Sequence, residues 1–131
     1  MERFIGKLAP AFFALLRIVA GVMFAMHGTQ KLLGWPGSKP PATAALSIAA
    51  GVIEVGAGLL IAIGLFASWA AFLASGTMAT AYFLRHAEDG IFPIVNRGEL
   101  AVLYGFLFLF IAAHGAGAWS IDQRMRERAA L

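Results

Sequence analysis

The sequence contains no cysteine. Disulfides, thiol relays, thiolate zinc sites and cysteine-held iron–sulfur clusters are therefore excluded. Only three histidines are present, and none has a metal-ligand spacing such as HxxxH or HExxH. We therefore predict no metal site and no covalently bound cofactor. Any redox chemistry then depends on a substrate, a bound small molecule or a partner.

Charge is also sparse. Only 13% of the 131 residues are charged and 60% are hydrophobic, against about 25% and about 45–50% in soluble domains. The basic residues are divided between termini and loops and form no stripe with stacking aromatics, which excludes a nucleic-acid partner. The composition predicts an all-α, polytopic membrane protein whose main partner is the lipid bilayer. The length fits a single domain, residues 1–131.

Four apolar stretches predict a bundle of four transmembrane helices, at about residues 10–33, 42–66, 68–86 and 98–118. A Pro- and Gly-rich segment separates the first two stretches, and an uncharged turn near residues 64–69 makes the second and third antiparallel neighbours. The first stretch is too long for a secretory signal and lacks a cleavage site, so we expect it to be retained.

A short amphipathic helix is expected after the fourth span, because Ser120 to Gln123 have the form of a capping box. Arginines follow at 124, 126 and 128, and they serve either as a topology anchor or to attract anionic headgroups. Four spans place both termini on one side of the membrane. Five cations on that side against four on the other favour cytoplasmic termini: Arg3, Lys7, Arg124, Arg126 and Arg128 against Lys31, Lys39, Arg85 and Arg97.

Two charged residues lie inside the apolar spans. Arg17 interrupts the first span, and Glu54 lies near the middle of the second. An ion in hydrocarbon costs several kcal/mol unless it is paired or hydrated, so we predict an intramembrane ion pair between Arg17 and Glu54. Such a pair either fixes the register of the helices or belongs to a substrate or proton site.

A second polar group is expected near the opposite surface, where the first span ends and the fourth begins. Its members are His27, Gln30, Lys31, Asn96, Arg97 and Glu99. A histidine there exchanges protons near neutral pH, and Lys31 or Asn96 can polarise a carbonyl. We predict catalytic roles for His27 and Lys31, with a quinone-type ring bound against Phe24 and Tyr104 and close to Asn96 and Glu99. The alternative is a set of hydrogen-bonded interfacial residues with a snorkelling lysine.

Several short elements recur in a familiar order from Phe12 to Asp122. They are Arg17, His27-Gly28, Lys31-Leu32, Gly51, Glu54, Gly56, Gly58, Gly64-Leu65, Asn96-x-Gly98-Glu99-Leu100, Gly115-x-Gly117 and Ser120-Ile121-Asp122. Together they resemble the DoxX-like family of small bacterial membrane proteins. The chain departs from the usual family ending, Gly-Pro-Gly-Arg-Tyr-Ser-Leu-Asp, because Ala116, Ala118 and Trp119 replace its proline, arginine and tyrosine.

The resemblance implies a four-helix, multi-pass protein of the bacterial inner membrane. It also implies a membrane subunit of a quinone-linked oxidoreductase or an oxidative-stress system, which binds a small redox molecule between helices. A soluble or membrane oxidoreductase subunit would then be its partner, and a homo-oligomer is open. The alternative is a non-catalytic membrane scaffold or small-solute carrier whose Arg–Glu pair is structural.

Overall fold

The computed structural model describes all 131 residues and contains helical elements only. Short α1 (Glu2–Ile5) and η1 (Gly6–Leu8) precede four longer helices: α2 (Ala9–Leu33), α3 (Ala45–Ile63), α4 (Ala67–Ala81) and α6 (Glu99–His114). The π-helical turn η2 (Tyr82–His86) extends α4 directly, and η3 (Ala87–Asp89) and α5 (Pro93–Asn96) lead into α6. The chain ends in α7 (Ile121–Ala129). The all-α prediction is confirmed.

The helix ends follow the local sequence. Pro10 occupies the first turn of α2, and left-handed glycines end α2 at Gly34 (φ 71°) and α3 at Gly64 (φ 71°). The fourth apolar helix is shorter than residues 98–118, because Gly115 and Gly117 both have positive φ and end α6 at His114. Ser120 caps α7, its Oγ accepting a hydrogen bond from the backbone N–H of Gln123 at 3.2 Å.

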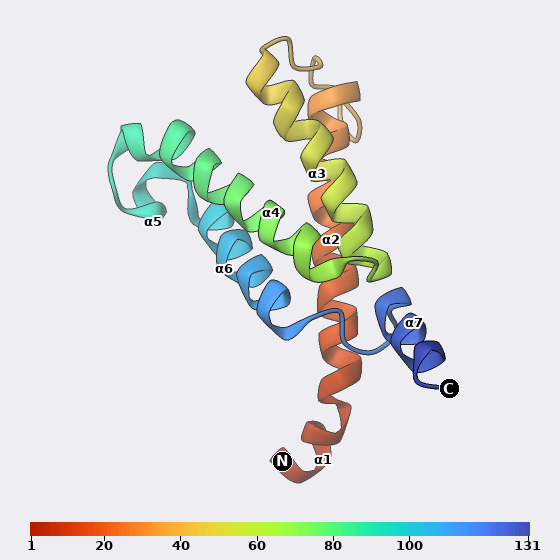
Figure 1. The fold of residues 1–131 in the computed structure, drawn as a ribbon. Coiled ribbons are helices and arrows are strands. Elements are labelled where there is room, and N and C mark those ends of the chain that lie inside the picture. Colours follow the sequence, from red (N-terminus) through yellow and green to blue (C-terminus); the bar gives the residue numbers. More distant parts are fainter.

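The long helices are arranged as two pairs (Figure 1). In one pair α2 packs along α3, and in the other α4 packs along α6. The second pair crosses the first obliquely, and the two diverge toward the end that holds the loop 34–44 and α5. Both termini lie toward the opposite end.

Glycines set the register of α2 against α3. A Cβ on Gly21 would lie 2.6 Å from the carbonyl oxygen of Gly58, and one on Gly28 would lie 2.5 Å from that of Gly51. Both distances are too short for any side chain, so the two backbones touch at these levels. This antiparallel register decides which polar residues meet.

The core lies between the two pairs. It combines large side chains on α2 and α6, mainly Phe24, Tyr104 and Phe108, with alanines, Ile61 and Met78 on α3 and α4. Most other large apolar side chains are exposed on the outside of the bundle. Two helical segments, Glu2–Leu33 and Ala45–Ile63, are long and apolar enough to cross a membrane, and α6 is a shorter apolar helix.

Candidate functional site

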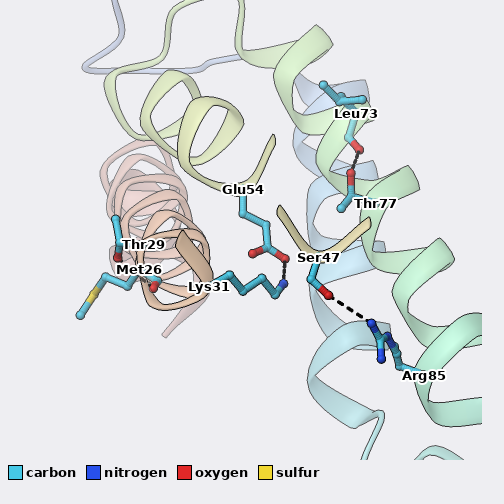
Figure 2. Close-up of polar contacts among 8 residues, drawn as sticks. All are labelled: Met26, Thr29, Lys31, Ser47, Glu54, Leu73, Thr77 and Arg85. Carbon is cyan, nitrogen blue, oxygen red and sulfur yellow. Dashed lines mark hydrogen bonds and ion pairs between the residues drawn. The ribbon is translucent and has the colours of Figure 1, made fainter. Parts of the chain in front are cut away.

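Glu54 has a cationic partner, but that partner is Lys31. The Lys31 ammonium donates to Oε1 of Glu54, and this is the one ion pair in the structure. Glu54 is buried in the middle of α3 with 1% of its side chain exposed, whereas the Lys31 side chain in the last turn of α2 is 36% exposed. Figure 2 shows Lys31 extended toward the Glu54 carboxylate. The second oxygen, Oε2, is buried and has no hydrogen-bond partner.

The predicted pair between Arg17 and Glu54 is therefore wrong. The glycine contacts place Arg17 opposite the end of α3 and Glu54 opposite Ala25 on α2. These two levels differ by about eight residues, or about 12 Å along the helix axis. The sequence showed that both charges lie inside spans but not that they lie at different levels, because the register of the two helices depends on where the glycines meet.

Arg17 is buried, and its guanidinium is stabilised by hydrogen bonds to backbone carbonyls instead of by a carboxylate. Its Nη1 donates to the carbonyl oxygens of Ile61 (2.6 Å) and Ala62 (2.7 Å), in the last turn of α3. Its Nη2 donates to the carbonyl oxygens of Trp119 (3.0 Å) and Ala118 (3.4 Å), in the linker between α6 and α7. The last carbonyls of a helix lack partners and carry partial negative charge, so a guanidinium is well suited to this position. Arg17 thus ties the α6–α7 linker to the end of α3.

Asp122 completes the same junction from the other side of the turn. Its Oδ1 accepts from the backbone N–H of Phe66 at 2.8 Å, and its Oδ2 accepts from that of Ala67 at 2.9 Å. Its own N–H donates to the carbonyl oxygen of Gly64 at 2.9 Å. A carboxylate at a helix N-terminus is favourable, so Asp122 caps α4 across 55 residues of sequence. The capping box signalled the start of α7 but carried no signal for this distant partner.

A groove of about 900 Å³ lies between α3 and α4 where the two pairs diverge. Its walls are mostly apolar and include Ile53, Trp69 and Phe72, and Lys31 contributes to its lining. Arg85, at the end of the π-helical extension of α4, donates to Oγ of Ser47 on α3 at 3.1 Å, and both residues line the groove. Figure 2 shows Lys31 of α2 reaching Glu54 of α3, and Arg85 of the α4 extension reaching Ser47 of α3. The groove therefore combines apolar walls with a few hydrogen-bond donors.

His27, Phe24 and Tyr104 come together as the sequence suggested, between α2 and α6. The His27 and Tyr104 ring centroids are 6.1 Å apart with perpendicular planes, and those of Phe24 and Tyr104 are 5.8 Å apart. The Tyr104 hydroxyl is buried without a hydrogen-bond partner. None of these three residues lines the α3–α4 groove, so the structure gives His27 and Lys31 different neighbours.

Asn96 makes its hydrogen bonds within the segment that connects α4 to α6. Its Nδ2 donates to the carbonyl oxygen of Gly90 (2.7 Å) and to the Tyr82 hydroxyl (3.1 Å), and its Oδ1 accepts from the Gly98 N–H (2.8 Å). Its carbonyl oxygen lies 3.0 Å from Nδ1 of His86. Glu99, at the start of α6, is exposed and makes no ion pair. Asn96 therefore stabilises the connection to α6 and makes no hydrogen bond with His27 or Lys31.

The structure contains no cluster of three or more His, Asp or Glu side chains that could hold a metal ion.

The DoxX family model matches residues 12–87, which include α2, α3 and α4 and therefore both walls of the groove. An uncharacterised protein of Haemophilus influenzae is 46% identical over 125 residues, covering 90% of this chain and 93% of the relative. No solved structure matches the chain. The chain is a helical membrane protein and belongs to the DoxX family.

Proposed function

We propose that this protein is a membrane-embedded subunit of a quinone-linked oxidoreductase or oxidative-stress system, and that a quinone-type molecule binds in the α3–α4 groove. The observation that carries the proposal is the Lys31–Glu54 pair beside an apolar groove of about 900 Å³. A quinone has an apolar ring and two carbonyl oxygens, so it needs apolar walls and a small number of donors. The sequence predicted catalytic roles for both His27 and Lys31, and the present proposal keeps Lys31 beside the ring and leaves out His27, which does not line the groove.

The buried polar atoms fit such a ligand. Lys31 is partly exposed and has three donor hydrogens, of which one serves Glu54, so another can polarise a carbonyl oxygen. Glu54 is 1% exposed and does not line the groove, so in this proposal it acts through Lys31, whose ammonium it holds at the groove wall. Reduction of a quinone to a quinol consumes two electrons and two protons. The chain has no cysteine to carry electrons, so in this proposal a soluble or membrane partner oxidoreductase supplies them and water supplies the two protons.

The same proposal includes four membrane spans: α2, α3, α4 with η2, and α6. Both termini lie toward one end of the bundle, as an even number of crossings requires. The orientation with cytoplasmic termini gains support from the ion pair, because Lys31 is engaged with Glu54 and no longer counts as a loop cation. Five cations at the terminal side then oppose three, namely Lys39, Arg85 and Arg97. In a bacterium this orientation corresponds to the inner membrane.

Arg17 favours the second candidate function, a non-catalytic scaffold or small-solute carrier. All of its hydrogen bonds go to backbone carbonyls at a junction of three chain segments, so its charge has a structural use. The two functions differ in whether the groove binds a ring. A direct binding measurement therefore separates them.

Quinone binding can be tested with two matched glycine variants. Gly76 lines the groove and Gly56 does not, and both are exposed helical positions where an added Cβ meets nothing within 4 Å. Purified protein is titrated with a short-chain ubiquinone or menaquinone, and quenching of tryptophan fluorescence is followed, since Trp69 lies in the groove wall. We expect Gly76→Leu to abolish saturable quenching and Gly56→Leu to retain it.

Lys31→Gln gives a chemical test of the same site, because it removes the charged donor while keeping a side chain of similar length. We expect roughly a tenfold weaker quinone affinity, which corresponds to the loss of one hydrogen bond from a charged donor. Absence of saturable binding by the wild-type protein, or wild-type affinity in Gly76→Leu, would favour the scaffold function.

A further inference from the structure

The C-terminal helix α7 presents an apolar edge bordered by arginines. At about 100° per residue, Ile121 and Met125 share one edge of the helix, with Arg124 and Arg128 on one side of it and Arg126 on the other. Ile121 is 39% exposed and Met125 is 52% exposed, although both are apolar. An apolar edge between cationic flanks is the pattern of a helix that lies in the membrane interface.

This edge continues onto the bundle at the start of α4. A cavity of about 290 Å³ lies between the two helices and is lined by Phe66, Ser68, Trp69, Asp122, Met125 and Arg126. Phe66 is 60% exposed and Trp69 is 78% exposed, so the apolar surface of α7 extends along the outside of α4. Exposed tryptophans are typical of the level of lipid headgroups.

The cationic charge at this corner is available to a ligand. None of the three arginines of α7 forms an ion pair or donates a side-chain hydrogen bond within the protein. Asp122 also lines the cavity and keeps its negative charge, but both of its carboxylate oxygens accept backbone N–H groups at the start of α4. The three arginines of α7 outnumber its two acids, Asp122 and Glu127, so the helix carries a net positive charge.

The corner is also fixed in place. The Asp122 N–H donates to the Gly64 carbonyl, and Arg17 holds the carbonyl of Trp119 just before α7. These contacts hold the backbone of α7 against the α3–α4 turn, so the helix that carries Arg126 stays next to Ser68 at the start of α4. The held backbone distinguishes this site from a mobile basic tail.

From this geometry we infer that the corner between α7 and the start of α4 binds the headgroup of an anionic phospholipid. Arg126 and Ser68 would contact the phosphate, with Arg124 and Arg128 adding long-range attraction, and the acyl chains would lie along Phe66 and Trp69. A phospholipid is favoured over a soluble phosphate because the apolar surface runs on from the cavity along α4. The site is separate from the proposed quinone site, although Trp69 borders both.

Native mass spectrometry of the full-length protein in mild detergent tests the inference. The protein is titrated in parallel with phosphatidylglycerol and phosphatidylcholine carrying the same acyl chains. We expect preferential retention of phosphatidylglycerol, reduced about fivefold by Arg126→Gln and retained in Arg126→Lys. Removing all three arginines of α7 should abolish the preference. Lys39→Gln is the matched control, because it also removes one exposed cation but lies in the loop at the other end of the bundle.

The variants should fold normally, since Arg126 makes no hydrogen bond within the protein, and the melting temperature without added lipid checks this. The inference is overturned if Arg126→Gln keeps the full preference for phosphatidylglycerol, or if Lys39→Gln lowers it equally, which would indicate diffuse attraction. Displacement of the lipid by glycerol 3-phosphate at equal concentration would also overturn it, because the site would then recognise soluble phosphate.

Discussion

Replacing Lys31 by methionine should destabilise the protein more than replacing Glu54 by glutamine, although each change removes one partner of the same ion pair. Glu54 is 1% exposed, so in Lys31→Met its carboxylate stays in the interior without a counter-charge. Lys31 is 36% exposed on a flexible side chain, so in Glu54→Gln the ammonium can turn toward the groove and its solvent. The asymmetry follows from the different burial of the two ends.

The expected losses in the free energy of unfolding follow from this burial. Leaving a buried charge unpaired costs about 3–5 kcal/mol, and the partial exposure of Lys31 places Lys31→Met near 3 kcal/mol. Glu54→Gln keeps the shape and one acceptor, so we expect a loss of about 1–2 kcal/mol. Because the two residues touch, the double variant should lose less than the sum, with a coupling of about 1–3 kcal/mol. Arg17→Met combined with Glu54→Gln should instead be additive within about 0.5 kcal/mol, since these residues lie about 12 Å apart along the helix axis.

Unfolding in mixed detergent micelles, followed by circular dichroism, gives the free energy of unfolding of each single and double variant, and from these the two couplings. Helical content at the start of each titration provides the folding control. The reasoning is refuted if Lys31→Met and Glu54→Gln are additive, or if the coupling appears between Arg17 and Glu54. The first result would refute the Lys31–Glu54 pair, and the second would restore the Arg17–Glu54 pair suggested by the sequence.

Substitutions at three further sites test the helix packing and the helix junction by the same unfolding measurement. Arg17→Lys should cost roughly 1.5–3 kcal/mol, because a single ammonium cannot reach both pairs of carbonyls; wild-type stability would contradict the arrangement. Gly21→Ala should cost about 1–3 kcal/mol, since its Cβ would lie 2.6 Å from the Gly58 carbonyl oxygen. In the control Gly56→Ala the new Cβ meets nothing within 4 Å, so this change should be neutral or stabilising. Equal effects of the two changes would show that α2 and α3 are not in close contact. Asp122→Ala should cost about 1–2 kcal/mol through loss of the α4 cap, and Asp122→Asn should recover part of it; no loss in either variant would argue against the cap.

The fold class and most helix positions were readable from the sequence, because apolar length and helix-ending residues act locally. The first expected span, residues 10–33, corresponds to α2 at Ala9–Leu33, and the third, residues 68–86, corresponds to α4 with η2. The fourth, residues 98–118, extends four residues past the end of α6, because Gly115 and Gly117 fit an apolar run by composition although both adopt positive φ. The start of α7 was marked by Ser120, whose cap is a contact within one turn.

The sequence also identified Arg17 and Glu54 as residues that require partners, because a charge inside an apolar span is costly wherever it lies. It gave Lys31 another role, as a catalytic or a snorkelling side chain. Only the tertiary structure decided which partners they have. Contacts between Gly21 and Gly58 and between Gly28 and Gly51 set the register of α2 on α3, and this register takes Arg17 to the end of α3 and away from Glu54. The groove arises from the angle between two helix pairs, and Asp122 reaches α4 across 55 residues. Composition and spacing fix what each residue needs, whereas the approach of distant backbones fixes which group supplies it.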